Sequence, residues 1–532
     1  MSVTRSSASA LSSSLPPFDP RRLRAALPFI VAASISTAAV WYFAAHGWLL
    51  YYGDAEAHLN IARRLFDNRT PSLEQFGVPW LPVPHLITAP FAAVDALWHS
   101  GLAGAIPSAM CFIAAAVFLF RALEEIFGSR VPAWIGMLIF LANPNVLYLQ
   151  STSMTEAAFA ACLFGLLDAS VRFRRTQSEA HVAAAAIFAT LGTLTRYEGW
   201  ALLPFCAVYF FLVARRRWTA TLTFCAIAAL GPAIWLFYNW WLSGDPLEFA
   251  RGPGSAKAIQ GGVPYPGLHD WKLSWLYFRT DMRLALGAVL FWIGAAGLAA
   301  ALLRRRFWPV LLLSLPPVFY IFNLHSGDSP IHMPELWPHS WYNTRYALAA
   351  LPLAAFCAAA ITRRRAGLLL VVLAILPWIL HPNPEHWITW KESQVNSVSR
   401  RAWTDQSAAW LRRHREPGDT VMSDFDDTIG IFRYAQIPLR EVFHPGNGLA
   451  WEAAIQRPEL FMNSGWVVCQ RRKSSRLSQA MAHAAHYHRV HTITVPGAEP
   501  IDFYKYANPF YESPWRAERL PALVDKRSSG RV

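Results

Sequence analysis

The sequence predicts a polytopic α-helical membrane protein with a C-terminal extracytoplasmic α/β domain. Of its 532 residues, 54% are hydrophobic and only 15% are charged. The hydrophobic residues gather in repeated runs of about 20, the length that crosses a bilayer as a helix. Short arginine clusters lie between these runs and contribute to the net charge of +14. Such clusters are typical of cytoplasmic loops, so the charge does not indicate a nucleic-acid partner.

We expect about eleven spans in a transmembrane domain over residues 27–381. The apolar segments lie near residues 27–50, 103–122, 131–149, 154–172, 182–196, 199–214, 219–242, 284–303, 307–324, 344–361 and 366–381. Two segments separate each successive pair of arginine clusters, so all four clusters are expected on the cytoplasmic side; they lie at residues 172–175, 215–217, 304–306 and 363–365. The outer side then receives the C-terminus and three loops, at residues 51–102, 243–283 and 325–343.

Residues 85–99 form a shorter apolar segment that is not expected to cross the membrane. The segment is interrupted by Pro90 and contains Asp95, and a run of about 14 residues is too short for an ordinary span. A full crossing would also place the arginine cluster at residues 172–175 outside. We therefore expect this segment to lie in the interface or to re-enter.

The two ends of the chain differ from the apolar middle. Residues 1–26 are rich in Ser and Pro and end in arginines, which favours a disordered cytoplasmic N-terminus and a retained first span over a cleaved signal peptide. Residues 382–512 have the composition of a soluble domain, with helices expected at residues 397–415 and 475–486 and strands at residues 420–423, 465–470 and 489–495. Residues 513–532 are expected to be a disordered tail.

The first outer loop carries the strongest candidate site. Asp54, Glu56 and His58 follow directly on the first apolar run. Residues 52–64 predict an amphipathic helix lying on the membrane, in which Asp54 and His58 are one turn apart and Glu56 points elsewhere. A carboxylate beside an imidazole can deprotonate an acceptor hydroxyl. The structural alternative is a set of solvated charges that cap the first span.

Further candidates lie at the same predicted face. Glu156 begins an apolar run, where it is either a helix-capping residue or a site residue. Arg345 opens a late span at headgroup level, where a guanidinium can hold a lipid phosphate by paired hydrogen bonds or simply extend to the interface. The loop before it adds four pocket candidates: His332, Glu335, Tyr342 and Asn343.

Other polar motifs are better explained without catalysis. Arg196 and Glu198 are expected to pair at a polar hairpin tip between two apolar runs. The Gly- and Pro-rich residues 251–267 form either a linker or a lid. The acidic residues 424–427 resemble a metal-binding triplet of nucleotide-sugar enzymes but also suit a helix cap. Neither the six cysteines nor the histidines show metal-ligand spacing, so no metal site is predicted.

Taken in order, several short motifs resemble the GT-C glycosyltransferases, the polytopic class that includes protein O-mannosyltransferases and the lipid A aminoarabinose transferases. The resemblance rests on Asp54 with Glu56 after the first span, the Pro-bounded residues 80–85, the pairs Asn143-Pro144 and Thr155-Glu156, and residues 343–346 at the start of a late span. An outer C-terminal α/β domain fits the same class.

This resemblance implies an inverting transfer of a sugar from a polyprenyl-phosphate donor at the outer face of the cell (inner) membrane. Asp54 would be the general base, Glu56 and Glu156 would shape the acceptor or donor pocket, and Arg345 would hold the leaving phosphate. No cofactor is expected beyond the lipid-linked donor, and the acceptor would be a lipid, a glycan or a protein. The chain departs from the protein O-mannosyltransferases in having Asp-Ala-Glu instead of adjacent acidic residues and in lacking a β-trefoil insert.

A transporter or flippase of lipid-linked sugars is the main alternative, because it would also need an arginine at headgroup level. Transporters usually place their polar groups at mid-membrane, whereas most ionisable residues here are expected at the outer interface. A lipid-binding scaffold without catalysis is a further alternative. Replacement of Asp54 separates an enzyme from both.

Overall fold

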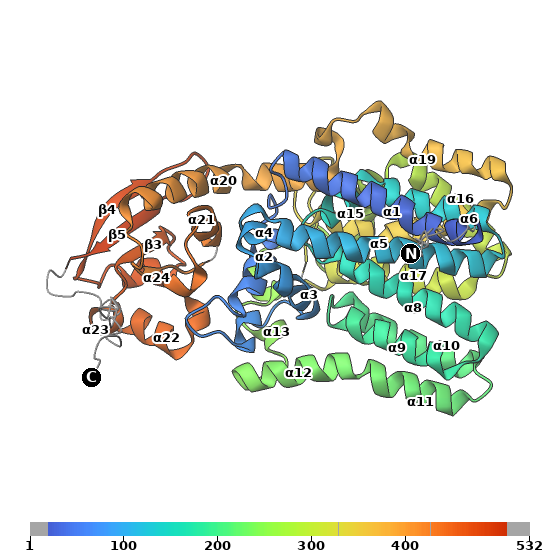
Figure 1. The fold of residues 1–532 in the computed structure, drawn as a ribbon, viewed down its shortest axis with the longest axis horizontal. Coiled ribbons are helices and arrows are strands. Elements are labelled where there is room, and N and C mark those ends of the chain that lie inside the picture. Colours follow the sequence, from blue (N-terminus) through green and yellow to red (C-terminus); the bar gives the residue numbers. More distant parts are fainter. Residues whose placement is uncertain (1–19, 328, 426, 508–532) are drawn as a thin grey trace, which may run out of the picture.

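The computed structural model describes residues 20–327, 329–425 and 427–507. The molecule is elongated, with a helical bundle at one end and a small sheet with its helices at the other (Figure 1). The expected disordered N-terminus falls largely outside the described residues, and the expected tail at residues 513–532 falls wholly outside them.

Long apolar helices build the bundle. Its main helices are α1 (Pro20–Ala45), α5 (Leu102–Phe127), α6 (Arg130–Ala142), α7 (Pro144–Gln150), α8 (Glu156–Thr176), α9 (Glu179–Thr193), α10 (Glu198–Val213), α11 (Arg217–Ala228), α12 (Leu230–Ser243), α16 (Ala288–Leu303), α17 (Phe307–Ser326), α18 (Leu351–Ile361) and α19 (Leu369–Leu380). In the bundle α5 packs along α1, α6 and α8, while α16 packs along α18. The buried side chains between them form one large hydrophobic core.

Five helices of the described chain are long and apolar enough to cross a membrane, or up to seven if each bent pair counts as one span. The bent pairs are α6 with α7, at 68°, and α15 (Trp271–Leu286) with α16, at 111°. Several expected spans are helices of 16 residues or fewer, including α9, α10 and α19. The chain is a multi-pass membrane protein, and the count of eleven spans stays a prediction.

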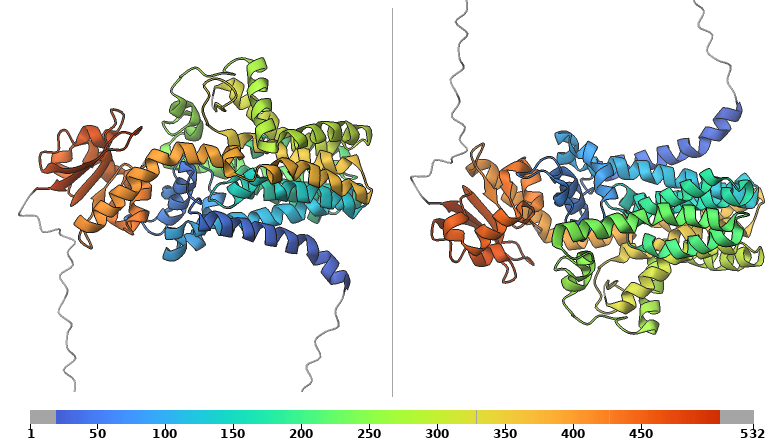
Figure 2. Two further views of the ribbon diagram at one scale, coloured as in Figure 1. Left: turned by 90° about the horizontal axis from the view of Figure 1, so that it is seen from above. Right: turned by 90° about the horizontal axis from the view of Figure 1, so that it is seen from below.

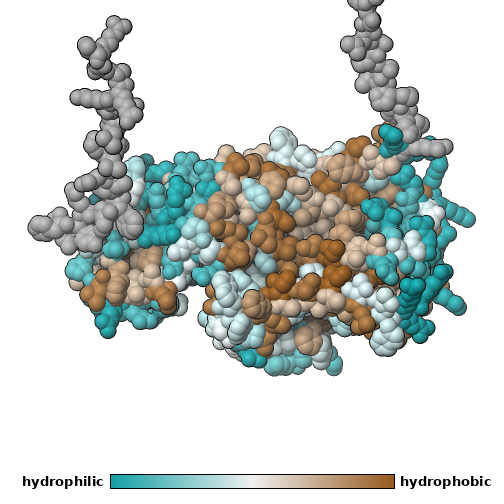
Figure 3. Space-filling model, turned by 60° about the horizontal axis from the view of Figure 1, so that its bottom comes forward, coloured by the Kyte–Doolittle hydropathy of each residue, from teal (hydrophilic) through white to brown (hydrophobic). Residues whose placement is uncertain are grey.

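The arginine clusters gather at one end of the bundle. The guanidinium of Arg130, at the start of α6, donates to the carbonyl of Arg24 in α1 at 2.8 Å. The side-chain oxygen of Gln177 accepts a hydrogen bond of 2.9 Å from the backbone of Arg215. Arg304 donates to the carbonyl of Ile361 at 3.1 Å. Figure 3 shows hydrophilic residues at both ends of the molecule and a broad hydrophobic band over the bundle between them, as expected for a protein that lies across a bilayer.

Short helices fill the space between the bundle and the C-terminal sheet. They are α2 (Gly53–Arg64), η1 (Leu73–Phe76), α3 (Val83–Ala92) and α4 (Asp95–Ser100). Residues 85–99, not expected to cross, form most of α3 and α4, with the chain turning between them. On one side, α13 (Glu248–Arg251), α14 (Ala256–Gln260) and α15 protrude from the bundle (Figure 2).

Helix α20 (Ile388–His414) runs from the bundle to the C-terminal sheet (Figures 1 and 2). The sheet has the order β2-β1-β3-β5-β4, formed by β1 (Val421–Met422), β2 (Val442–Phe443), β3 (Trp466–Gln470), β4 (Tyr487–Ile493) and β5 (Ile501–Tyr506). Strand β1 pairs in parallel with β2 and β3, whereas β5 pairs antiparallel with β3 and β4. The accompanying helices are α21 (Ile429–Tyr434), α22 (Leu449–Gln456), α23 (Pro458–Phe461) and α24 (Arg476–Ala480), with the short turns η5 (Leu439–Glu441) and η6 (Pro445–Asn447).

The expected helix at residues 397–415 is the second half of α20, and strands β1, β3 and β4 overlap the three expected strands. The helix expected at residues 475–486 is helical only in α24. Strands β2 and β5 were not expected from the sequence. In the sheet, β2 pairs with β1, and β5 lies between β3 and β4.

Candidate active site

Four chain segments that begin helices meet where the bundle faces α2. Asp54 lies in the first turn of α2, Glu156 is the first residue of α8, and Glu198 is the first residue of α10. A carboxylate in the first turn of a helix interacts favourably with the positive end of the helix dipole. The fourth segment is η2 (Thr344–Ala350), which carries Arg345.

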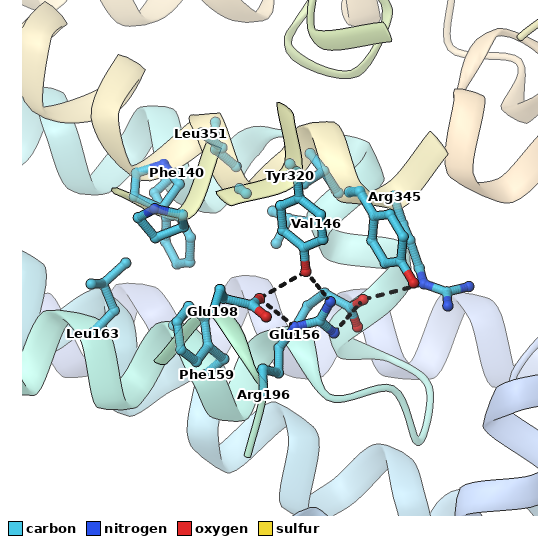
Figure 4. A pocket seen from close by; sticks show the side chains of 16 residues that line it. Phe140, Val146, Glu156, Phe159, Leu163, Arg196, Glu198, Tyr320, Arg345 and Leu351 are labelled. Carbon is cyan, nitrogen blue, oxygen red and sulfur yellow. Dashed lines mark hydrogen bonds and ion pairs between the residues drawn. The ribbon is translucent and has the colours of Figure 1, made fainter. Parts of the chain in front are cut away.

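These segments bring five charged side chains into one continuous chain of ion pairs. Arg345 donates from Nη2 to Asp54 Oδ2 at 2.6 Å, and its Nε lies 3.4 Å from Glu156 Oε1. Arg196 binds the same Glu156 oxygen at 2.9 Å and Glu198 Oε1 at 2.5 Å. Carboxylates and guanidinium groups therefore alternate from Asp54 to Glu198, and Figure 4 shows most of this array. We call these five residues the charge cluster.

Aromatic side chains hold the two guanidinium groups in place. The Tyr320 hydroxyl accepts a hydrogen bond from Arg196 and donates one of 2.8 Å to Glu198 Oε1. The Tyr346 ring stacks on Tyr320 with 4.5 Å between centroids. Arg345 lies 5.3 Å from the ring centre of Tyr52 and 5.2 Å from that of Tyr346, within the range of cation–π attraction.

A cavity of about 50 Å³ lies against the charge cluster. Glu156, Arg196, Glu198 and Arg345 line it at one end, and its remaining wall is mainly apolar: Phe140, Val146, Phe159, Ala160, Leu163, Pro316, Leu348, Ala349, Leu351 and Pro352 (Figure 4). Pockets that enclose small molecules usually measure about 300–1,000 Å³. A sugar phosphate would therefore fit here only after lining side chains move.

Asp54 differs from the rest of the cluster in its exposure. Its side chain is 39% exposed, whereas the Arg345 side chain is only 10% exposed. Partial burial tends to raise the pKa of Asp54, but the Arg345 guanidinium and other nearby positive charge outweigh that effect, so the pKa lies below its ordinary value. Asp54 is thus an ionised carboxylate near neutral pH that remains within reach of a ligand from outside.

His58 follows Asp54 by one turn of α2 but is held by a different partner. Its Nδ1 lies 2.8 Å from Nε2 of His85 in α3, and its ring lies against Trp80. Burial lowers the pKa of His58 to about 4. The imidazole is therefore neutral near neutral pH and contributes no positive charge beside Asp54.

Glu56 does not join the charge cluster. Both of its carboxylate oxygens accept hydrogen bonds from Arg433 in α21, at 2.7 and 2.8 Å, and Asn60 donates a third at 3.0 Å. The pair is almost completely buried. Its visible role is to join α2 to the C-terminal region, in keeping with the expectation that Glu56 points away from Asp54.

The four candidates of the loop at residues 325–343 form different contacts. Glu335 forms an exposed ion pair of 2.6 Å with Arg283 and is not a member of the charge cluster. His332 and Tyr342 exchange backbone hydrogen bonds of 2.9 and 3.1 Å. Burial raises the pKa of Tyr342, and the neighbouring Tyr346 and Asp54 act in the same direction. Asn343 adopts a left-handed conformation with φ of 57° and donates its side-chain amide to Pro330 at 3.0 Å.

One residue that sequence reasoning missed positions Arg345. Glu392 in α20 is 3% exposed, and it accepts hydrogen bonds from the backbone of Asn343 and Thr344 at 3.0 and 2.8 Å and from the Thr344 hydroxyl at 2.5 Å. It therefore caps the segment that presents Arg345. A single Glu at the edge of a predicted soluble domain gives no sequence signal of this role.

The sequence assigned structural roles to the Arg196 and Glu198 pair and to the acidic residues 424–427, and the structure shows different contacts for the two. Arg196 and Glu198 do pair, as expected for a hairpin tip, but Arg196 also binds Glu156 and so belongs to the charge cluster. In the acidic stretch, Asp424 accepts a hydrogen bond of 2.8 Å from Ser475, and Asp427 pairs with Arg472 at 2.8 Å. No group of three or more His, Cys, Asp or Glu within the described residues is arranged to hold a metal ion.

Comparisons with known proteins agree with this architecture. Residues 80–241 match the family model of the dolichyl-phosphate-mannose-protein mannosyltransferases. The match includes Glu156, Arg196 and Glu198 but neither Asp54 nor Arg345. No curated protein sequence matches the chain.

Solved structures with a similar fold include ArnT from Cupriavidus metallidurans. The apo form has a TM-score of 0.53 at 14% identity, over 88% of this chain and 98% of ArnT. The form bound to undecaprenyl phosphate has a TM-score of 0.51 at 13% identity, over 89% and 98%. The apo form of the oligosaccharyltransferase from Archaeoglobus fulgidus has a TM-score of 0.47 at 14% identity, over 92% of this chain and 75% of the oligosaccharyltransferase. The family match over residues 80–241 and the ArnT-like fold confirm the predicted resemblance to the GT-C glycosyltransferases at the level of the fold.

Proposed function

We propose that this protein is an integral-membrane glycosyltransferase that moves a sugar from a polyprenyl-phosphate donor to an acceptor hydroxyl with inversion at the anomeric carbon. The observation that carries the proposal is the pairing of a partly exposed carboxylate, Asp54, with a buried guanidinium, Arg345, beside a mainly apolar cavity. The mannosyltransferase family match and the ArnT-like fold support the same reaction class. The bound undecaprenyl phosphate of one ArnT structure supports a polyprenyl-phosphate donor.

In this reaction Asp54 is the general base and Arg345 stabilises the leaving group. Asp54 takes the proton of the acceptor hydroxyl as its oxygen bonds to the anomeric carbon. The bond from that carbon to the phosphate oxygen breaks on the opposite face, and its electron pair leaves with the phosphate. A phosphate leaving group needs nearby positive charge more than it needs a proton, which Arg345 supplies.

The apolar wall of the cavity suits the prenyl part of such a donor, and its charged end suits the phosphate. The cluster contains three carboxylates and two guanidinium groups, and in the absence of donor each guanidinium forms ion pairs with two of the carboxylates. Donor binding would require Arg345 to exchange part of its contact with Asp54 or Glu156 for the phosphate. This exchange would free Asp54 for the acceptor only when the donor is bound.

The position of the site supports transfer at the extracytoplasmic face of the cell membrane. The charge cluster lies at the α2 end of the bundle, whereas the arginine clusters lie at the opposite end. By the positive-inside rule the arginine end faces the cytoplasm. The C-terminal sheet, which lies beyond α2, would then also be extracytoplasmic.

The direct test is product formation from a panel of radiolabelled polyprenyl-phosphate sugars with membranes that contain the protein. We expect one donor to give a labelled product with the wild type and almost none with D54N. A flippase would instead move the lipid-linked sugar across the bilayer without forming a new glycosidic bond. Since the two guanidinium groups supply positive charge, we also expect EDTA to leave the transfer rate unchanged; loss of activity that returns with a divalent ion would contradict a metal-free reaction.

A further inference from the structure

A second group of basic side chains lies at the far end of α2. Arg64 ends α2, and Arg69 lies in the loop that follows. Arg64 donates to the carbonyl of Gln75 at 3.3 Å and lies 5.7 Å from the ring centre of Phe425. Arg69 lies 5.0 Å from the ring centre of Phe443. Neither guanidinium forms an ion pair with any residue that the structure describes.

Other arginines of the same region, in contrast to Arg64 and Arg69, do form ion pairs. Arg63 forms ion pairs of 2.7 Å with both Asp67 and Asp95. Arg440 also pairs with Asp67, at 3.1 Å. Asp67 and Asp95 are therefore engaged by other arginines, and within the described part of the chain no ion pair compensates Arg64 or Arg69.

Buried polar atoms without partners concentrate in the same short stretch. They are Arg64 Nε, Asn68 Nδ2, Arg69 Nη2, Ser72 Oγ and Gln75 Oε1. Asn68 is only 4% exposed and Gln75 only 1%. Four of these five atoms can donate a hydrogen bond, and a buried donor without an acceptor is costly. The stretch therefore offers a set of donors and positive charge that an anion would satisfy.

The opposite wall of this region is formed by β2 and η6, and His444 lies at its centre. His444 Nε2 lies 3.1 Å from Asn68 Oδ1, and its ring stacks on Phe425 with 4.1 Å between centroids. Burial lowers the pKa of His444, and the charges of Arg64 and Arg69 lower it further. Arg64 faces Phe425, which stacks on the His444 ring, and Arg69 faces the adjacent Phe443, so each guanidinium group lies against an aromatic neighbour of His444. We call residues 64–75 together with residues 443–447 the basic seam.

We propose that the basic seam binds an oxyanion, a phosphate or carboxylate group, carried by the sugar acceptor. Guanidinium groups bind both anions through paired, charge-assisted hydrogen bonds. Arg64 and Arg69 are only partly buried, and Thr70 and Pro71 beside them are exposed, so an anion can reach the seam from outside.

The assignment of this anion to the acceptor rests on the proposed function. Asp54 and Arg64 lie ten residues apart on α2, about 15 Å along the helix axis. An acceptor whose hydroxyl lies at Asp54 could therefore extend along α2 and place an anionic group at the seam. The donor phosphate is a separate ligand, assigned to Arg345.

The first test measures binding of inorganic phosphate to the purified full-length protein by isothermal titration calorimetry at constant ionic strength. We expect a saturable phosphate site whose affinity falls at least tenfold in R64Q/R69Q, because both guanidinium groups are removed. The matched control is R476Q, which removes an arginine that pairs with Glu452 on the surface. If R64Q/R69Q does not fold, the single variant R69Q is used, with an expected loss of at least threefold. Equal phosphate affinity in the wild type and the seam variants would overturn the site.

The second test distinguishes an acceptor-borne anion from free phosphate. Sugar transfer is measured with the active labelled donor and increasing amounts of a membrane extract as the acceptor source. We expect inorganic phosphate to raise the half-saturating amount of extract for the wild type, and R64Q/R69Q to require more extract without responding to phosphate. Phosphate that binds the seam without affecting acceptor saturation would overturn the acceptor assignment. Absence of transfer by the wild type would contradict the proposed function, while the calorimetric result would still decide the oxyanion site.

Discussion

The two ends of α2 have opposite electrostatic settings. At its start, Asp54 and Arg345 belong to a cluster in which each charged group has an oppositely charged partner. At its end, Arg64 and Arg69 have aromatic neighbours but no ion pair with the described residues. A compensated site must break existing contacts before it can bind a ligand, whereas an uncompensated one gains contacts on binding. Under the two proposals, the donor phosphate binds at the start of α2 and an anionic group of the acceptor binds at its end.

Replacement of Asp54, at the start of α2 where every charge of the cluster has a partner (the compensated end), should have the largest effect on the transfer rate. D54N keeps the shape of the side chain but cannot accept the acceptor proton, so we expect the initial rate of sugar transfer to fall about 10³-fold, within the range measured for general bases. Initial rates with the labelled donor measure this effect. D427N is a matched control, because Asp427 pairs with Arg472 on the C-terminal region, and it should retain wild-type rates. Full transfer by D54N would remove Asp54 from the role of base.

Replacement of Arg345 should have the next largest effect and also changes the ionisation of Asp54. R345A should raise the KM for the donor about 100-fold, since loss of a charge-assisted contact to phosphate costs about 2–3 kcal/mol. Arg345 holds the pKa of Asp54 down, while burial acts in the opposite direction. Without Arg345 the pKa of Asp54 rises, so the acidic limb of the pH–rate profile should move to higher pH.

The control for this prediction is R345K, which keeps the positive charge but loses the planar, two-pronged geometry of the guanidinium. It should leave the acidic limb close to that of the wild type and still weaken donor binding. An R345A enzyme with unchanged donor KM and an unchanged pH profile would show that Arg345 contacts neither the donor nor the base.

Glu392 tests whether the compensated end depends on support from α20. E392A leaves three buried donors of Asn343 and Thr344 without their acceptor, so we expect unfolding to become easier by about 2–4 kcal/mol. Because the segment that presents Arg345 would lose its position, donor KM should rise about tenfold with a smaller change in kcat. E392Q retains one acceptor oxygen and should restore much of the donor KM. A loss of stability without any change in KM would make Glu392 purely structural.

The sequence predicted the membrane class, the GT-C resemblance and several elements of the C-terminal sheet, because these depend on local pattern. Runs of apolar residues, clusters of arginine and short strand signals are each visible within about 20 residues. The number of spans could not be fixed, since α6 with α7 and α15 with α16 are bent pairs whose geometry depends on packing.

The site was predictable only in part for the same reason. Asp54, Glu156 and Arg345 could be named because each lies at the end of an apolar run. The inclusion of Arg196 depends on the fold bringing the start of α10 beside the start of α8, and the role of Glu392 depends on α20 returning to the bundle. Long-range contacts of this kind leave no periodic signal in the sequence. The basic seam was missed too, because its character comes from the absence of acidic partners in space.

Replacement of Glu56, which pairs with Arg433, should have the smallest effect on catalysis. It tests whether Glu56, in the first turns of α2, stabilises the fold without taking part in the reaction. E56Q leaves the buried Arg433 guanidinium without its carboxylate, so we expect the free energy of unfolding to fall by about 3 kcal/mol. Sugar transfer by the folded protein should stay within about threefold of the wild type, because Glu56 faces α21 and not Asp54.

The pH dependence of stability provides an independent check on Glu56. Burial opposes ionisation of Glu56, but Arg433 and other partners lower its pKa below the ordinary value. A carboxylate whose pKa is lower in the folded state stabilises the fold at neutral pH and loses that contribution as the pH falls through its folded-state pKa. The difference in stability between wild type and E56Q should therefore be greatest near neutral pH and shrink in acid. A rate loss of about 100-fold in E56Q, with stability unchanged, would instead place Glu56 in the reacting pocket and extend the compensated end of α2 towards the basic seam.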